Sequence, residues 1–258
     1  MPDTEPAPGL GEEPPARVQV QDGVVHRPAQ PWTPTVHALL EHLHRQGLTC
    51  VPRPVGIHDG VETVTALEGE AGAHCWPHQA TDRGLASAAR LLRSIHDACR
   101  GWDPPPWSRW AVPARQGADV LVCHGDPGPW NMVWQGGEAV GLFDWDIAHP
   151  APALDDIAYA LQYFTPFRDD AEALRWLGFT SPPRRSHRLR VFADAYGGQA
   201  ATLTSAELAD AVVAEQVRGV ERVAQLARQG VEPQRTWVEQ GHLDELQVRV
   251  NWSDALRF

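Results

Sequence analysis

The spacing of apolar and polar residues predicts a small β-rich unit followed by a larger helical one. In the first unit, valines alternate with polar residues about Asp22-Gly23, and two further apolar runs flank Asp59-Gly60. Asp-Gly between two such runs is a strong signal for a β-hairpin. The predicted elements of this unit are a hairpin over 17–28, a helix over 33–47, and strands over 51–58 and 61–67.

Helical periodicity dominates the second unit. Apolar residues recur three and four positions apart, which is the spacing that places them on one face of an α-helix. Thr204 and Glu207 match a capping box at the start of one helix. His96 falls on or near the apolar face of another, where we expect a packed core histidine rather than a ligand. The predicted helices span 82–100, 186–196, 204–230 and 242–252, and a further one begins at Asp155-Asp156. This pattern favours the α+β class.

The stretch from 120 to 158 differs from the rest because polar residues interrupt its short apolar runs. The predicted strands are 120–123, 132–134 and 139–143, the last two joined by a Gly-Gly hairpin turn. Asp126 follows the first strand, Asn131 precedes the second, and Asp144 follows the third. Two carboxylates and one carboxamide are therefore expected at the same end of these strands.

Those three side chains suit phosphoryl transfer. Mg²⁺ takes oxygen ligands and keeps several waters, so one or two side chains and substrate phosphates complete its shell; Asn131 and Asp144 are the expected ligands. Asp126, offset from the metal, is expected to accept the proton of an attacking hydroxyl. His124 completes the H-x-D-x-x-x-x-N spacing of a kinase catalytic loop. The alternative is a turn-rich loop whose polar side chains only satisfy the backbone, and it is disfavoured by the strand, the hairpin and the second Asp.

In this stretch the chain resembles the aminoglycoside phosphotransferase and choline kinase-like family. The matching residues are His124-Gly125-Asp126, Asn131, Asp144-Trp145-Asp146 and Asp155-Asp156-Ile157-Ala158. The resemblance implies a bilobal α+β protein-kinase-like fold, ATP or another NTP and Mg²⁺ as cofactors, and a small-molecule hydroxyl as phosphoryl acceptor. The expected parts are a disordered tail over 1–16, a nucleotide-binding N-lobe over 17–70, and a mainly helical C-lobe over 71–258 with the catalytic loop and the acceptor-substrate helices.

The resemblance also implies roles for residues around the motif. One of Asp155 and Asp156 is expected to accept hydrogen bonds from the catalytic-loop backbone, and N-capping of its helix is a compatible alternative. His124 is expected to buttress the loop rather than react. For Asp146, capping of the next segment is favoured over contact with a second metal. Residues 65–72 are expected to form the hinge between the lobes.

The N-lobe departs from the family pattern. The chain has no lysine, so all 22 of its basic residues are arginine, and Arg27 stands where the family has a phosphate-binding lysine. A surface arginine at a strand end is the alternative. No acid stands at 34–37, where the helix should carry the partner of that lysine, and Glu41 lies one turn too late. In place of a glycine pair ahead of the first hairpin stand Glu12 and Glu13, which would repel a triphosphate. These departures support an alternative function, a catalytically weak or inactive kinase-like module that binds a small molecule or a protein.

Charge and composition limit the partners. The formal charge of −11 argues against nucleic acid or an anionic membrane as the main partner, and an acidic surface would tolerate a cationic acceptor. The first residues do not resemble a signal peptide and no apolar run approaches a membrane span. The four cysteines form no C-x-x-C pair, so we expect reduced thiols and a cytoplasmic protein. Candidates for binding a cationic acceptor are the acids of the C-terminal helices, Asp194, Glu207, Asp210 and Glu215, although such acids more often lie on a solvated face.

Two segments rich in aromatic residues have no assigned chemistry. Residues 102–110 contain three tryptophans, which could line a substrate pocket or pack an irregular segment against the C-lobe. Residues 74–78, with the sequence HCWPH, match no zinc-ligand spacing and are expected to form a solvent-exposed linker.

Overall fold

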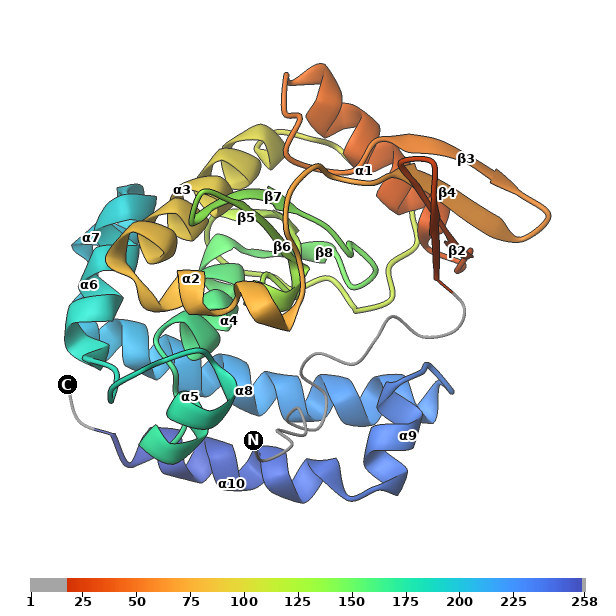
Figure 1. Ribbon diagram of the computed structural model, residues 1–258. Coiled ribbons are helices and arrows are strands. Elements are labelled where there is room, and N and C mark those ends of the chain that lie inside the picture. The colour runs from red at the N-terminus through yellow and green to blue at the C-terminus, as the bar shows by residue number, and fades with distance from the viewer. Residues whose placement is uncertain (1–17, 257–258) are drawn as a thin grey trace.

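The computed structural model describes residues 18–256. A small antiparallel sheet with one helix lies beside a larger, mainly helical part (Figure 1). This arrangement confirms the predicted bilobal α+β fold. The predicted tail over 1–16, which includes Glu12 and Glu13, falls outside the described residues, and the division of the lobes at residue 70 stays a prediction.

The smaller part, the N-lobe, is built from two hairpins and a helix. Its elements are β1 (Gln19–Gln21), β2 (Val24–Pro28), α1 (Thr33–Arg45), β3 (Pro54–His58) and β4 (Val61–Thr65), with the strands in the order β1-β2-β4-β3. Both turns are Asp-Gly, and all four turn residues have positive φ, between 51° and 77°. Two-residue turns with positive φ match the twist of the flanking strands, which is why Asp-Gly predicted both hairpins correctly.

The register of β2 against β4 brings two charged residues face to face. These strands pair antiparallel, with Arg27 directly opposite Glu62 and Val25 opposite Val64. Directly opposite side chains point to the same face of a sheet. The pairing therefore places a carboxylate beside Arg27 from within the sheet.

The segment after β4 carries the chain from the sheet to the larger part. Glu70 and Trp134 exchange two backbone hydrogen bonds of 2.8 and 2.9 Å. Gly69 has a φ of 136°, and a Cβ there would lie 2.5 Å from Val133, so only glycine allows this approach. The segment then forms the short helices η1 (Ala73–Cys75) and α2 (Pro77–Ala80). The prediction of an exposed linker over 74–78 was wrong, because Cys75 and Trp76 are buried.

The larger part, the C-lobe, combines helices with two small two-stranded sheets. Its first elements are α3 (Asp82–Cys99), β5 (Val120–Cys123), η2 (Pro129–Asn131), β6 (Met132–Gln135), β7 (Glu138–Leu142), β8 (His149–Pro152) and α4 (Ala153–Phe164). The remaining elements are α5 (Asp170–Trp176), α6 (Arg185–Tyr196), α7 (Gly198–Thr202), α8 (Ser205–Arg228), α9 (Gln234–Glu239) and α10 (His242–Asp254). β5 pairs with β8, and β6 pairs with β7.

The main hydrophobic core lies where α3 packs against α6 and β7. Leu85, Leu92 and Ile95 of α3 are fully buried, as its three-and-four spacing predicted. Two of the three tryptophans of residues 102–110, Trp102 and Trp110, lie against this core, edge to face, whereas Trp107 is 57% exposed. None of the helices in the described part of the chain has the length and apolar character that crossing a bilayer requires.

Candidate active site

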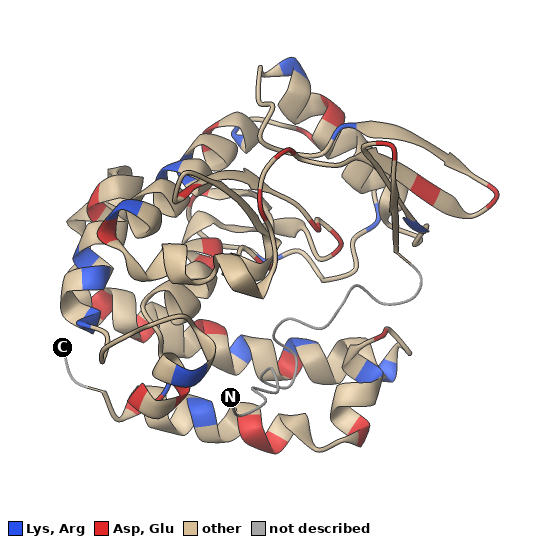
Figure 2. Ribbon diagram, viewed as in Figure 1, with Lys and Arg blue, Asp and Glu red and all other residues tan. Residues whose placement is uncertain are grey.

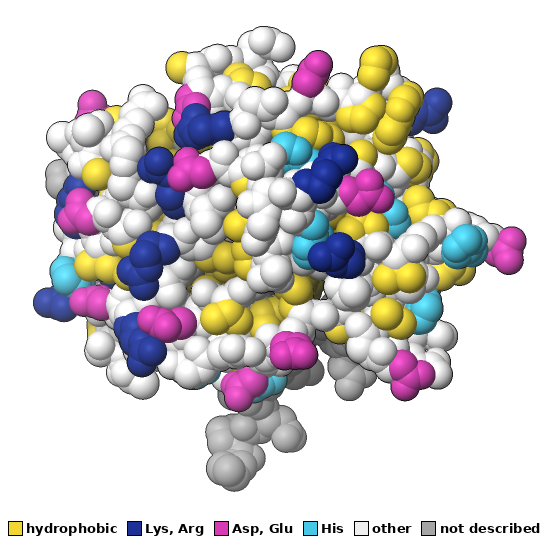
Figure 3. All heavy atoms as spheres, turned by 90° about the horizontal axis from the view of Figure 1, so that it is seen from above, with side chains coloured by type: hydrophobic (Ala, Val, Ile, Leu, Met, Phe, Trp, Pro, Cys, Tyr) yellow, Lys and Arg dark blue, Asp and Glu magenta, His cyan; other side chains and the backbone are white. Residues whose placement is uncertain are grey.

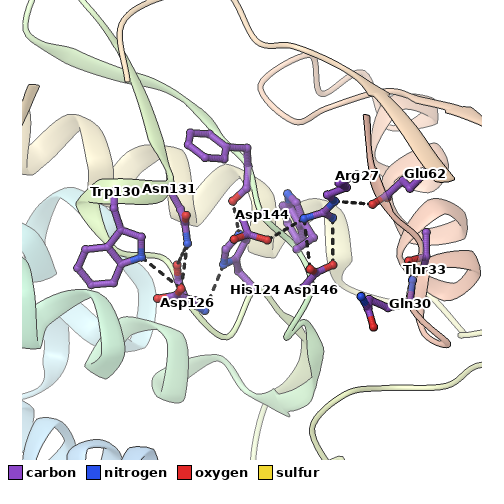
Figure 4. Close-up of polar contacts among 12 residues, drawn as sticks. Arg27, Gln30, Thr33, Glu62, His124, Asp126, Trp130, Asn131, Asp144 and Asp146 are labelled. Atoms are coloured by element: carbon purple, nitrogen blue, oxygen red, sulfur yellow. Dashed lines mark hydrogen bonds and ion pairs between the residues drawn. The ribbon is translucent and has the colours of Figure 1, made fainter. Parts of the chain in front are cut away.

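Three strand ends bring the predicted site residues together. His124-Gly125-Asp126 follows β5, Asn131 ends the short helix before β6, and Asp144 lies just beyond β7. The backbone N–H of Phe143 donates to the carbonyl of Asn131 over 2.9 Å, which fixes the end of β7 against the start of β6. The convergence expected from the strand pattern is seen in Figure 4.

Asp126 and Asn131 are in direct contact. The Asn131 Nδ2 donates to Asp126 Oδ2 over 3.0 Å and to the Asp126 carbonyl over 2.9 Å. The indole N–H of Trp130 donates to the same carboxylate oxygen over 3.2 Å. Because the Asn131 nitrogen faces Asp126, its amide oxygen is the atom left for a cation.

The Asp126 carboxyl has the electrostatic environment of a proton acceptor. Burial raises its pKa to about 7, and the nearby charge of Asp144 acts in the same direction, while the hydroxyl of Tyr159 and the indole of Trp130 partly offset the rise. A base whose pKa lies near neutral pH combines ionisation with a driving force for taking a proton. Asp126 also lines a pocket of about 420 Å³, so its carboxyl faces a space that a small molecule could fill.

Asp156 holds the loop that carries Asp126. Its carboxylate accepts from the backbone N–H groups of His124 and Gly125 over 2.6 and 2.8 Å, and from His96 Nε2 over 3.1 Å. Burial alone would raise its pKa, but the hydrogen bond and charge of His96 lower it below the ordinary value. The predicted role for one of the two acids is confirmed for Asp156, and His96 is the buried core histidine that was expected.

His124 supports the catalytic loop through both of its ring nitrogens. Its Nε2 donates to the carbonyl of Phe143 over 2.9 Å, its Nδ1 accepts from the backbone N–H of Asp126 over 3.2 Å, and its ring lies edge to face with Trp145. Burial lowers its pKa, so the ring is neutral. Both nitrogens are occupied, which agrees with a structural role.

A second cluster links the two lobes through Arg27. Its Nε donates to Glu62 over 2.5 Å, its Nη1 to Asp144 over 3.0 Å, and its Nη2 to Asp146 over 3.0 Å (Figure 4). Burial would lower the pKa of Arg27, but the three carboxylates outweigh it and raise the pKa. Arg27 is therefore not the isolated surface arginine considered as an alternative.

The acidic partner of Arg27 comes from a strand rather than a helix. Glu62 of β4 is 1% exposed and also contacts His37 Nε2 of α1 over 2.9 Å. Burial raises the pKa of Glu62, but His37 and Arg27 together lower it below its ordinary value. Where the family pattern has an acid, α1 thus carries His37, which contacts Glu62 of β4. The facing register of β2 and β4 was the signal that could have identified Glu62.

Asp146 departs from the expected capping role, because its carboxylate accepts hydrogen bonds from both terminal nitrogens of Arg27. Asp144 has a φ of 62°, a conformation that is uncommon outside glycine and is often found at functional sites. Around Arg27 there are thus three carboxylates and one guanidinium, an excess of negative charge. Such an oxygen-rich, anionic set is the chemistry that Mg²⁺ prefers, so the residues present fit this metal.

The pocket above Asp126 contains groups that the sequence did not reveal. Trp130 and Tyr163 stand edge to face with ring centroids 4.4 Å apart, and both line the pocket with Arg168, Arg222 and Arg249. The Arg222 Nη1 donates to the carbonyl of Gly125 over 3.0 Å, which ties α8 to the catalytic loop.

The acids proposed to bind a cationic acceptor lie elsewhere. Glu215 pairs with Arg218 and Arg222, Asp194 pairs with Arg190, and Glu207 completes the capping box of α8. None of the four proposed acids lines the pocket. Both acidic and basic positions occur along α8 and α10 (Figure 2). Acidic and basic side chains are also interspersed on the face seen from above in Figure 3.

The fold is that of the protein-kinase-like phosphotransferases, and the comparisons with known proteins agree. The phosphotransferase enzyme family matches residues 107–192. The trifolitoxin immunity protein of Rhizobium leguminosarum bv. trifolii is 34% identical over 181 residues, 68% of each chain. The chain belongs to the phosphotransferase enzyme family.

Solved structures share the fold at low identity. Ethanolamine kinase from Plasmodium vivax has a TM-score of 0.56 at 10% identity, covering 89% of this chain and 75% of that one. Spectinomycin phosphotransferase in complex with ADP and spectinomycin has a TM-score of 0.55 at 10% identity, covering 90% and 84%. The GDP complex of an aminoglycoside 2'-phosphotransferase has a TM-score of 0.54 at 12% identity, covering 94% and 92%. At these identities the likeness shows the fold alone.

Proposed function

We propose that the protein transfers the γ-phosphoryl group of ATP, or of another NTP, to a hydroxyl of a small molecule in a Mg²⁺-dependent reaction. The observation that carries the proposal is the buried Asp126 carboxylate, which faces a pocket of about 420 Å³ and whose pKa burial raises to about 7. A general base of this kind and a pocket for its substrate are what hydroxyl phosphorylation needs. Solved members of the fold bind ADP or GDP, which supports a nucleotide as the donor.

Asp126 orients the acceptor hydroxyl and takes its proton as the new P–O bond forms. Trp130 and Asn131 hold Asp126 Oδ2 by hydrogen bonds of 3.2 and 3.0 Å. The other oxygen, Oδ1, is buried without a hydrogen-bond partner among residues 18–256 and is left for the acceptor hydroxyl. Arg222, bonded to the Gly125 carbonyl, keeps the loop in place. Most of the rate acceleration then comes from positioning and charge.

Asp144 and the amide oxygen of Asn131 would hold Mg²⁺, which when bound neutralises charge on the phosphates. Arg27 would steady those phosphates. To do so its guanidinium must give up the contact with Asp144, which is only one of its three ion pairs. Glu62 would retain Arg27 through its Nε and Asp146 through its Nη2, while the Nη1 that Asp144 releases would turn to the nucleotide.

The second candidate is a catalytically weak or inactive module that binds a small molecule or a protein. The observation that favours it is the same cluster, since a guanidinium held by Asp144 and Asp146 supplies permanently the positive charge that a metal would bring. Against it stands Asp126, whose carboxyl lines the pocket and has a pKa that suits a base.

The name of the curated relative suggests a biological role. An immunity protein protects a cell against a toxin, and a toxin that carries a hydroxyl group can be inactivated by phosphorylation. We extend the proposal to this role, with the acceptor a hydroxylated toxin.

The test is a screen for ADP release from ATP and Mg²⁺ over hydroxylated compounds, including toxins, aminoglycosides and amino alcohols. Each active compound is repeated with Asp126→Ala. We expect turnover to fall by roughly a hundredfold to ten-thousandfold, the usual share of general base catalysis, while nucleotide affinity is unchanged. Equal turnover in the variant would contradict the role of Asp126.

A further inference from the structure

Two arginines line the pocket and share one carboxylate at a distance too long for a hydrogen bond. Arg168 lies between α4 and α5, and Arg249 lies in α10. The Arg168 Nη1 is 3.7 Å and the Arg249 Nη2 is 3.8 Å from Oε2 of Glu172. Charge-assisted hydrogen bonds are roughly 2.8 Å long, so Glu172 satisfies neither guanidinium.

Among residues 18–256, Arg168 has no close anionic partner, and it is buried. Its side chain is 2% exposed, and its Nε and that of Arg249 are both buried with no hydrogen-bond partner among residues 18–256. Burial, reinforced by the like charge of Arg249, lowers the pKa of Arg168 to about 10. A buried charge with unmet hydrogen bonds costs free energy, and an anion entering the pocket would remove that cost.

Two amide oxygens in the same pocket also lack a donor. Oε1 of Gln216 and Oε1 of Gln234 are buried and accept no hydrogen bond within the described chain. The pocket therefore presents unmet donors at the two arginines and unmet acceptors at the two glutamines. A ligand that satisfies both carries an anionic group together with hydroxyl or amide hydrogens.

An aromatic wall connects the subsite at Arg168 and Arg249 to Asp126. Trp130, which donates to Asp126, stands against Tyr163, and the guanidinium of Arg168 lies over the Tyr163 ring, 5.3 Å from its centroid. A molecule lying along this wall would have its hydroxyl at Asp126, its apolar body on the two rings and its anionic end at Arg168. This order of groups follows from the contacts alone.

The carboxylates already present do not fill the subsite. The side chain of Glu172 is 40% exposed, so water competes for it, and its distances leave room for a closer anion. Glu245 also lines the pocket, but it forms no ion pair with either arginine in the described part of the chain. The third lining arginine, Arg222, is already paired with Glu215.

We propose that the pocket takes an acceptor that bears a carboxylate, bound between Arg168 and Arg249, with an apolar body on Trp130 and Tyr163. A planar carboxylate matches the forked donors of arginine. The description of this molecule as a phosphoryl acceptor rests on the proposed function, whereas its binding does not. The subsite disfavours the polycationic acceptors that the acidic sequence suggested.

The experiment compares three probes that share a para-(hydroxymethyl)phenyl body and carry an anionic, a neutral or a cationic second group: para-(hydroxymethyl)benzoate, its amide and the corresponding benzylamine. Calorimetric titrations use the full chain without nucleotide, as wild type and as Arg249→Met. Arg249 is chosen because its side chain is 25% exposed and its replacement leaves the buried Arg168 in place. Arg228→Met is the matched control, since Arg228 is an exposed arginine of α8 that does not line the pocket.

We expect the benzoate to bind about tenfold or more tightly than the amide, with the amine weakest, and this preference to disappear in Arg249→Met but persist in Arg228→Met. Equal binding of amide and benzoate, a preference that survives Arg249→Met, or no binding of any probe up to millimolar concentration would overturn the proposal. Because nucleotide is absent, these outcomes are independent of phosphoryl transfer. An enzyme that binds the benzoate but fails every turnover assay contradicts the proposed function alone.

Discussion

The two halves of the site differ in how their charges are held. In the C-lobe half, Asp156 fixes the catalytic loop through two backbone N–H groups and His96, and all of these groups are buried. In the N-lobe half, one guanidinium is divided among Glu62, Asp144 and Asp146, and the last two side chains are 47% and 34% exposed. We call the first the fixed half. We call the second the exchangeable half, because Arg27 can change its partners there.

This difference suggests which half is built before substrates arrive. Buried and fully hydrogen-bonded groups are organised in advance, as catalysis requires of a base. An arginine with three competing carboxylates can instead exchange partners at modest cost when phosphates and a metal enter. The following predictions are ordered by expected effect.

The largest expected effect is on the fixed half. Asp156→Asn should lower the free energy of unfolding by about 3 kcal/mol, because a buried carboxylate with three donors is replaced by an amide that cannot accept from all of them. Urea unfolding measures the change. Asp155→Asn is the matched control: Asp155 pairs with Arg115 and Arg218 nearer the surface, and should cost about 1 kcal/mol or less. Similar losses in both variants would show that Asp156 is not the support described.

A smaller effect is expected on the exchangeable half. Arg27→Met should weaken ATP binding by roughly tenfold to a hundredfold, because a charge-assisted contact to phosphate is lost. It should also tighten Mg²⁺ binding in the absence of nucleotide, since Asp144 and Asp146 lose their resident cation. Calorimetry measures both affinities.

The control for Arg27→Met is Arg53→Met, which removes another, exposed arginine of the N-lobe. ATP affinity that is the same in Arg27→Met and wild type would favour the inactive module, in which Arg27 serves the structure only.

The pH dependence has the most gradual effect. Asp126 acts as a base only when ionised, and burial raises its pKa to about 7, so kcat/KM should fall about tenfold per pH unit below neutrality and level off above it. A carboxyl with an ordinary pKa of about 4 would keep the profile flat down to that pH. The profile of kcat/KM against pH distinguishes a pKa of about 7 from an ordinary carboxyl pKa. A profile that stays flat between about pH 5 and about pH 7 would contradict a base with a raised pKa.

The fixed half of the site could be predicted from sequence because its order is local. Asp126 and Asn131 of this half, and Asp144 of the other, follow one another across a strand, a hairpin and a second strand, so their convergence depends on neighbouring segments only. The family resemblance then placed an acid of the Asp155-Asp156 pair on the loop, and Asp156 does hold it.

The exchangeable half could be predicted only in part. Arg27 was identified, but its partner Glu62 was not, because the family pattern places the acid on the helix at 34–37 and this chain places it on the facing strand. Asp146 was expected to cap a segment, and nothing local reveals that Arg27 crosses between lobes to reach it.

The pocket could not be predicted because it depends on tertiary packing. Arg168 and Arg249 come from segments far apart in the chain and meet through the packing of α10 against α8 and of α8 against α4. Short elements around them, such as α5 and α9, have too few residues for a periodic pattern to identify them. Hydrophobic periodicity predicts that long helices exist, but not which of their polar residues share a cavity.

The most direct test of the account is calorimetric titration of ATP with and without Mg²⁺, in wild type and in Asp144→Ala. The account predicts micromolar binding that requires Mg²⁺ and is lost in the variant, because Asp144 would help to hold the metal and Arg27, released from Asp144, would contact the phosphates. No binding up to millimolar ATP, or binding that is indifferent to both Mg²⁺ and Asp144, would contradict it and leave Arg27 as a permanent substitute for the metal.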